Sequence, residues 1–513
     1  MTPGLFDKAA LASVQIAPAI SPEYGRVMAI PVETFHLTSR AQGTLQARIQ
    51  QMVADGILSG RFRRGEKLPS TRALARHLNV SRITVTLAYT EMLANDYLTS
   101  RGRSGYFVSD NAPEPPDFAP TPQSQDTVNW NEMLARRYTG GPAFNMGRPA
   151  DWASYRFPFI YGQTDPALFD HANWRLCATQ ALGQRHFNAL TQDQFDADDP
   201  ELVRFIAHHT LPRRGILARP EEILITLGAQ NALWLATQLL AVTREVVVEN
   251  PCYPALRQLL THADAQVTPL SVDNDGLPPE TIPDGTRVIF TTPSHQCPTS
   301  ATLPLARREA LLRRAADLDA VIVEDDYEFE MAYLSAPSPA LKSLDEDGRV
   351  IYVGSFSKSL FPGLRLGYLV GSAEFIREAR ALRASVLRHP PGHIQRTVAH
   401  FLSLGHYDAL VRRIGRALAA RREMMEHATA RYGLEVAGEG AHGGSGLWMR
   451  APKDRDMRDV ARSLQSESVL IEPGTAFFAG EQPPHNFYRL GYSSIPSERI
   501  EEGIARIAAV LKA

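Results

Sequence analysis

Cysteine is scarce in this sequence, which has only Cys177, Cys252 and Cys297 among its 513 residues. The three are far apart and odd in number, and no two of them form a Cys-x-x-Cys pair. This usage argues against a disulfide framework and against a zinc site, and it is typical of proteins in a reducing cytosol. We therefore expect a cytoplasmic protein without a bound metal.

Long apolar runs are also missing. No stretch reaches the roughly 18 consecutive apolar residues that a membrane-spanning helix needs. Near the start, Asp7 and Lys8 interrupt the apolar residues, so no cleavable signal peptide is expected. These features predict a protein that does not enter a membrane.

The chain has no excess of one charge, since its formal net charge is only −2. The charges are unevenly placed, however. Between Arg40 and Val108 there are 11 Lys or Arg against 4 Asp or Glu, a net charge of +7, which leaves −9 for the remainder. A basic segment on an acidic body indicates a polyanionic partner for that segment alone.

Apolar residues make up 44% of the chain, enough for a large core, and the length favours two or three domains. The stretch 110–124 contains five prolines and little hydrophobic periodicity, which is typical of a semi-extended linker. The predicted order is a disordered extension over 1–38, a small basic domain over 39–109, the linker over 110–129 and a large domain over 130–513.

The small basic domain has the pattern of a winged helix-turn-helix. Apolar residues at helical spacing predict a first helix that ends at Gly60. Ser70 and Ser81 each precede a helical stretch and are good N-caps for a second and a third helix. Two short strands around an Arg/Gly tip are then expected over 97–109.

The large domain alternates short Val/Ile-rich runs with amphipathic helical stretches. Near-continuous apolar strands separated by helices predict an α/β fold with a mostly parallel sheet covered on both faces. From about Leu404 the pattern changes to a long Arg-rich helix and a smaller α+β unit. The expected strands are 222–227, 245–250, 287–293, 320–326, 349–355 and 365–371.

Several chemically distinctive residues follow these strands, at the edge of the sheet where ligands of such folds bind. Lys358 comes just after one strand, and Asp325 ends another, with Tyr327 two residues on. A buried carboxylate at Asp325 requires a positive partner, such as a protonated ring nitrogen. Tyr253 follows a further strand and could stack on a flat ring.

A phosphate cradle is predicted beside them. A strand turns into a helix at Gly228, where exposed backbone N–H groups and the helix dipole favour an anion. Hydroxyl groups and a forked cation suited to phosphate lie on the segment around Lys358. The predicted cradle consists of Gly228, Ala229, Gln230, Ser355, Ser357 and Arg365.

Together these residues indicate a site for pyridoxal 5'-phosphate. Lys358 would form the Schiff base, Asp325 would keep the ring nitrogen protonated, and Tyr327 would donate to the ring oxygen. Each residue alone has a simpler explanation: a solvated lysine, a helix cap, a core tyrosine or an ion pair. Their occurrence in order, each at a strand end, favours the cofactor.

Two sequence stretches carry a resemblance to known families. Residues 355–368, SFSKSLFPGLRLGY, together with EDDYEFE at 324–330, resemble fold-type I aminotransferases. Residues 68–108 are similar to the winged helix-turn-helix of the GntR superfamily. In this order the two parts resemble the MocR (GabR-like) transcriptional regulators. This resemblance implies a homodimer in which each DNA-binding lobe packs against the partner's large domain.

One position departs from the aminotransferase pattern. Aminotransferases of this type carry an Asn that contacts the ring oxygen, where this chain has Cys297. The change puts efficient transamination in doubt and leaves cofactor binding intact. Three interpretations stay open: a cofactor-dependent regulator, which we favour, a working aminotransferase with a DNA-binding lobe, and a regulator that has lost its cofactor.

The third helix of the basic domain would present its N-terminal end to the major groove of double-stranded operator DNA. Arg82 can reach a guanine edge, and the hairpin tip would enter the minor groove or follow the backbone. The alternative is a solvated basic face. The predicted DNA contacts are Arg72, Ser81, Arg82, Thr84, Arg101 and Arg103.

Arg489 is the candidate for binding an effector. By resemblance, it matches the arginine that pairs with the substrate carboxylate in aminotransferases; a structural salt bridge is the alternative. The expected effector then has an amine that exchanges with Lys358 and a carboxylate or sulfonate held by Arg489. A weaker resemblance points to the branch that responds to taurine or ectoine derivatives. His295 is expected, at most, to line the pocket.

Overall fold

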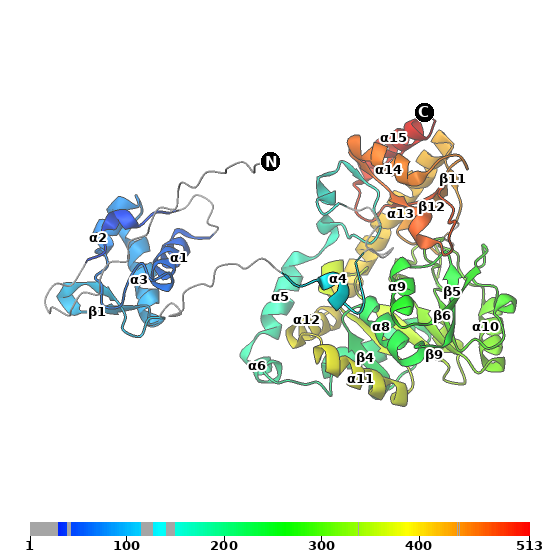
Figure 1. Cartoon of the computed structure of the whole chain (residues 1–513), viewed down its shortest axis with the longest axis horizontal. Coiled ribbons are helices and arrows are strands. Elements are labelled where there is room, and N and C mark those ends of the chain that lie inside the picture. Colours follow the sequence, from blue (N-terminus) through cyan, green and yellow to red (C-terminus); the bar gives the residue numbers. More distant parts are fainter. Residues whose placement is uncertain are drawn as a thin grey trace, which may run out of the picture. The chain divides into compact units, whose positions relative to one another are not determined.

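The chain divides into two compact units, Met1–Met133 and Leu134–Ala513 (Figure 1). This computed structural model describes residues 29–37, 43–113, 127–139, 149–336, 338–438, 440 and 442–512. Within those residues no helix combines the length and the hydropathy needed to cross a bilayer. The same residues contain no cluster of side chains suited to a metal ion.

The first unit is a winged helix-turn-helix, as predicted. The side chains of Thr44, Ser70 and Ser81 each accept a backbone N–H bond and cap the three helices in turn. The two strands form an antiparallel hairpin with Leu98 opposite Val108. The elements are α1 (Leu45–Leu58), α2 (Thr71–His77), α3 (Arg82–Ala94), β1 (Leu98–Ser100) and β2 (Tyr106–Val108).

Residues 29–37 also belong to this unit, which corrects the predicted extension over 1–38. Ile30 and Phe35 are buried in the core of the unit, and the Ile30 N–H donates to the carbonyl of Lys67 at 2.8 Å. Burial of these apolar side chains offsets the entropy of ordering the segment. Residues 1–28 and 38, and residues 114–126 of the predicted linker, lie outside the described residues.

The second unit contains a seven-stranded sheet with the order β4-β10-β9-β8-β7-β5-β6. Its pairings are parallel, except that β10 runs antiparallel to both of its neighbours. The strands are β4 (Ile223–Thr226), β5 (Glu245–Asn250), β6 (Gln266–Ser271), β7 (Val288–Thr291), β8 (Val321–Asp325), β9 (Val350–Ser355) and β10 (Gly367–Val370).

Sequence analysis missed one of these strands, β6. It lies at the edge of the sheet, where its residues are exposed or half-buried, and it contains Pro269. An edge strand needs no continuous apolar run and tolerates proline, so it lacks the pattern that marks the central strands.

Helices cover both faces of the sheet. In β5, Val246 and Val248 pack into one apolar cluster, which includes residues of α8, α9 and α11, whereas Val247 faces a second cluster with Leu311 of α10. The α-helices of this unit that precede α13 are α5 (His171–Ala181), α6 (Gln184–Leu190), α7 (Pro200–Phe205), α8 (Ala229–Leu240), α9 (Pro254–His262), α10 (Leu305–Asp317), α11 (Ala373–Leu387) and α12 (Gly392–Ser403).

The long helix α13 (His406–Tyr432) leads into a smaller α+β unit, as expected. Its sheet has the order β11-β12-β15-β14 and is antiparallel throughout. The elements are β11 (Glu435–Val436), β12 (Gly446–Arg450), α14 (Met457–Ser466), β14 (Glu472–Pro473), β15 (Phe487–Gly491) and α15 (Ile500–Lys512).

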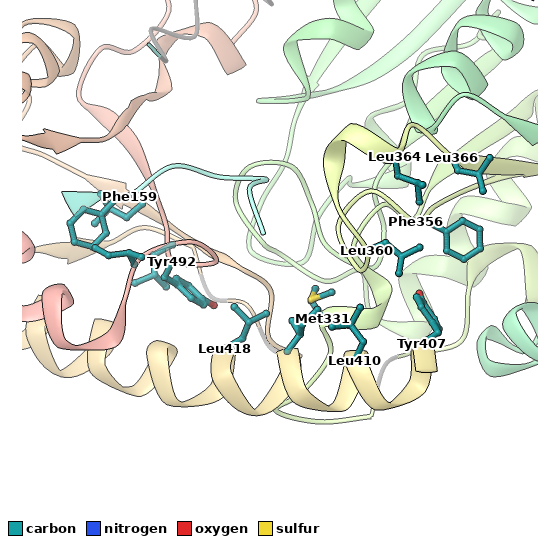
Figure 2. Close-up of a cluster of buried hydrophobic side chains, with 14 of the residues drawn as sticks. Phe159, Met331, Phe356, Leu360, Leu364, Leu366, Tyr407, Leu410, Leu418 and Tyr492 are labelled. Atoms are coloured by element: carbon teal, nitrogen blue, oxygen red, sulfur yellow. The ribbon is translucent and has the colours of Figure 1, made fainter. Parts of the chain in front are cut away.

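Apolar side chains of α13 anchor the segment that carries Lys358. Figure 2 shows Leu410 on α13 directed toward Met331 and Leu360, with Phe356 beside Tyr407. Phe356 and Leu360 flank Lys358 in the sequence, and both are buried. This packing holds the loop after β9 in place and so positions the lysine.

Candidate functional site

A cavity of about 450 Å³ lies where the predicted site residues meet. It is large enough for a small cofactor with its ligand. Gly228 is absent from its wall but lies next to Arg365, as described below. The predicted residues that line the cavity are Ala229, Gln230, Tyr253, Asp325, Tyr327, Ser355, Ser357, Lys358, Arg365 and Arg489, together with Cys297.

Lys358 is buried, and burial lowers the pKa of its amine to about 8. Its Nζ lies 4.2 Å from the centroid of the Tyr161 ring. Gly162 permits this position, because a Cβ there would lie 2.5 Å from Nζ. A lysine with a lowered pKa is more often neutral and therefore more nucleophilic at physiological pH.

Asp325 ends β8, and one oxygen of its side chain is buried. Its Oδ1 makes no hydrogen bond among the described residues. Burial raises the pKa of this carboxyl to about 7. An unsatisfied buried carboxyl oxygen is costly, and a protonated ring nitrogen would satisfy it. The observation fits the pyridine ring of pyridoxal phosphate.

The residues of the predicted phosphate cradle meet at the N-terminus of α8. Gly228 has φ +77°, and a Cβ there would lie 3.1 Å from Nη2 of Arg365. The guanidinium also donates to the carbonyl of Leu227 at 3.3 Å. The Ser357 hydroxyl is buried with no partner among the described residues. Free donors and a cation at a helix N-terminus fit a phosphate group.

Cys297 and Tyr253, two of the residues expected next to the ring, remain protonated at neutral pH. Burial raises the pKa of the Cys297 thiol and of the Tyr253 phenol to about 12 in each case. The Tyr253 hydroxyl donates to Oε1 of Gln230 at 3.0 Å. Cys297 therefore offers only a weak neutral donor where aminotransferases offer an amide.

Arg489 reaches the cavity from β15 and is paired. Its Nε donates to Oε2 of Glu472 at 2.9 Å, and both side chains are buried. Burial alone would lower the pKa of Arg489, but Glu472 raises it above its usual value. The guanidinium carbon lies 3.9 Å from the centroid of the Tyr161 ring and 4.7 Å from that of Phe477. Nε is thus occupied, and the two Nη groups are the donors left for an acid group.

Sequence analysis missed Tyr161, Glu328 and Glu472. Tyr161 lies against both Lys358 and Arg489, and its hydroxyl donates to Oε2 of Glu328 at 2.6 Å. Glu328 lies within EDDYEFE, the stretch that carries the family resemblance, so it could have been predicted as a site residue from its position. Tyr161 and Glu472 stand in stretches without such a signal.

His295 does not line this cavity. It lies behind it, where its Nε2 is 3.2 Å from Oε2 of Glu328. Burial lowers the pKa of His295. His295 therefore contacts Glu328 and takes no place in the wall of this cavity.

The predicted DNA contacts lie on the first unit. The side chains of Arg72, Arg82, Arg101 and Arg103 are exposed. Ser81 is engaged locally, because its Oγ accepts the Thr84 N–H at 3.1 Å and pairs with the Thr84 hydroxyl at 2.8 Å. The Ser81 hydroxyl thus caps α3 and is bonded to the Thr84 hydroxyl, whereas the four arginines expose most of their donors.

Comparison with known proteins gives two family matches. Residues 181–507 match the model of "Aminotransferase class I and II". Residues 45–108 match that of "Bacterial regulatory proteins, gntR family". Both matches fall in the units that the structure separates.

Two regulators are similar over nearly the whole chain. The "HTH-type transcriptional regulator TauR" of Rhodobacter capsulatus is 57% identical over 486 residues, which cover 94% of this chain and 100% of that protein. The "Probable rhizopine catabolism regulatory protein MocR" of Rhizobium meliloti is 31% identical, covering 87% of this chain and 90% of that one.

Solved aminotransferases share the fold of the large unit. The kynurenine aminotransferase of Pyrococcus horikoshii, solved with PMP, has a TM-score of 0.67 and 25% identity, covering 75% of this chain and 97% of its own. LysN of Thermus thermophilus, solved with N-(5'-phosphopyridoxyl)-L-leucine, has a TM-score of 0.64 and 27% identity, covering 75% and 98% respectively.

Proposed function

Because this chain belongs to the MocR-type transcriptional regulators of the GntR family, we propose that it binds pyridoxal phosphate and senses an amino-acid-like effector. The observation that carries the proposal is the cavity that joins Lys358, Arg365, Arg489 and Asp325, whose Oδ1 has no hydrogen-bond partner among the described residues. An amine, a carboxyl with an unsatisfied oxygen and two guanidinium groups around one cavity are typical of a binding site and not of a purely structural core.

Each part of the cofactor would find a partner in this cavity. Asp325 would hold the ring nitrogen, Tyr253 and Tyr327 would contact the ring, and Ser355, Ser357 and Arg365 would hold the phosphate beside Gly228. When bound, the cofactor supplies an aldehyde carbon that condenses reversibly with amines. Lys358 provides the resident amine, and its lowered pKa leaves it ready to release or accept a proton.

The effector is proposed to have an amine and one acid group. The amine would displace Lys358 by imine exchange, while the Nη groups of Arg489 would hold a carboxylate or sulfonate. Taurine, ectoine derivatives and related amino acids have this chemistry. Catabolic or uptake genes for such compounds are the proposed targets.

The DNA-binding unit would contact the operator through the arginines of α2, α3 and the hairpin. We propose that the protein acts in the cytoplasm as a homodimer, in which each lobe packs against the partner's large domain. Effector binding would change the relative placement of the two lobes and thereby the affinity for DNA.

The second candidate is a working aminotransferase, favoured by the similarity of the large unit to solved aminotransferases. Cys297 argues against it, because a neutral thiol is a poorer donor to the ring oxygen than an amide. Mixing the holo protein with an amine donor and 2-oxoglutarate distinguishes the two. Sustained keto-acid formation at enzyme-like rates would favour catalysis.

The proposed function is tested by two measurements on the same sample. Borohydride treatment of the holo protein, followed by peptide mapping, should place the cofactor label on Lys358. Titration with taurine should shift the cofactor absorbance and change the affinity for operator DNA in parallel. A label elsewhere would refute the cofactor site, and a spectral shift without a change in DNA affinity would refute the coupling for that ligand.

A further inference from the structure

The exposed face of α3 is apolar where a DNA-reading helix is expected to be polar. Ile83 is 72% exposed and Leu87 50% exposed, in a helix whose other apolar residues are mainly buried. Single exposed apolar residues are common, but these two are four residues apart and lie on one face. They extend over the two N-terminal turns, the part of the helix that enters the major groove.

The two threonines of the same face add no hydroxyl donor. Thr86 and Thr90 each donate the hydroxyl proton to the backbone carbonyl four residues earlier, at 2.9 Å in both cases. What they contribute to the face is therefore a methyl group and an acceptor oxygen. Ile83, Thr86, Leu87 and Thr90 thus form one stripe at positions i, i+3, i+4 and i+7, which we call the α3 stripe.

We infer that the α3 stripe reads thymine 5-methyl groups in the major groove of the operator, with Ile83 and Leu87 as the contacting side chains. The thymine methyl is the one apolar group that base pairs present in this groove, and apolar side chains are its usual partners. The segment 40–108 has a net charge of +7, which suits DNA and not an apolar protein partner.

The arginines near the α3 stripe have a different proposed role in DNA binding. Arg82 at the start of α3 is exposed, and its Nε donates to the Thr71 hydroxyl of α2 at 3.4 Å. Arg72 is exposed on α2. These cations supply affinity and orientation through phosphates or a guanine edge, and the stripe supplies discrimination between base pairs. The inference rests on DNA binding by this unit, which is part of the proposed function.

The test uses the full-length protein and a duplex that it selects from a random pool. Each thymine of the selected duplex is replaced in turn by deoxyuridine, which removes only the methyl group and keeps the base pairing. We expect at least one replacement to weaken binding about fourfold, which is the change in affinity that corresponds to burying one methyl group.

Each of the variants Ile83→Ala and Leu87→Ala removes one contacting side chain. At the thymine that this side chain contacts, replacement by deoxyuridine should then no longer weaken binding. Leu58→Ala is the matched control, because Leu58 is 44% exposed on α1, in the same unit. It should leave both affinity and methyl sensitivity unchanged. The truncated side chains are exposed, so thermal melting should match that of the unaltered protein.

The outcomes are distinct. If no uridine replacement weakens binding, or if the penalty persists in both alanine variants, the stripe does not read methyl groups and the inference is overturned. If the protein selects no duplex at all, it does not bind DNA specifically, and the proposed function is refuted together with the inference.

Discussion

Arg489 and Glu472 face each other across the antiparallel pair β14–β15 and form a buried ion pair at the wall of the cavity. The guanidinium lies against the rings of Tyr161 and Phe477, so both its plane and its Nε are held. An acid group of an effector would therefore meet the two Nη groups in a prepared orientation.

The first prediction concerns this pair. Glu472→Gln leaves a buried guanidinium without its counter-charge and should lower the free energy of unfolding by about 3 kcal/mol. An acid-bearing ligand such as taurine should restore part of that loss, because it supplies the missing negative charge. Chemical denaturation with and without the ligand measures both effects.

The matched control is Glu435→Gln. Glu435 pairs with Arg450 at 2.8 Å on the same small sheet, but both side chains are about half exposed. Its loss should cost less than about 1 kcal/mol and should not respond to the ligand. Equal losses in the two variants would contradict the role assigned to burial.

The second prediction concerns Lys358→Ala. The variant should lose the borohydride-trapped label and the spectral response to amines, because no other amine lines the cavity among the described residues. Affinity for operator DNA without effector should stay within about twofold, since α1, α2 and α3 form their own core. Absorbance and electrophoretic mobility shift measure the two outcomes. Loss of DNA binding in a folded variant would show that the cofactor is needed for it.

The third prediction concerns pH. A lysine attacks the cofactor aldehyde only as a neutral amine, and burial lowers the pKa of Lys358 to about 8. The rate of cofactor attachment to the apo protein should therefore rise with pH and level off above about 8. Below that value it should fall about tenfold per pH unit, as the neutral fraction does. Stopped-flow absorbance follows the reaction. An inflection near the ordinary lysine value of about 10.4 would contradict the burial argument.

The fourth prediction concerns the phosphate cradle. Gly228→Ala places a methyl group 3.1 Å from Nη2 of Arg365 and should weaken cofactor binding at least about tenfold. Gly285→Ala is the control, because Gly285 has a similar φ, +87°, but a Cβ there has nothing within 4 Å. The two variants share a positive φ and differ in the contact. Equilibrium dialysis of the cofactor should separate them. Equal affinities in the two variants would show that the space beside Arg365 does not govern cofactor binding.

Much of the site could be predicted because its residues follow strand ends. Lys358, Asp325 and Gly228 each come directly after or at the end of a strand, and strand ends of one sheet meet at one edge. The strands themselves were visible as buried Val/Ile runs. Predictions that depended on exposure were less complete. The hydroxyls of Ser81 and Thr84, predicted to contact DNA, are bonded to each other. Residues of 29–37 pack into the core of the first unit, where a disordered extension was predicted.

The sequence by itself determined the order of the elements, the two-unit organisation and the residue types available for chemistry, because helix caps, apolar periodicity and turn residues act locally. Only the tertiary structure decided that Glu472 pairs with Arg489 and that Tyr161 lies against both Lys358 and Arg489. The contact between Glu472 and Arg489 depends on the register of two strands. The contacts of Tyr161 depend on packing between distant segments, since Glu328, which accepts its hydroxyl proton, lies 167 residues further along the chain. No local pattern encodes such proximity; the joint burial of the whole unit sets it.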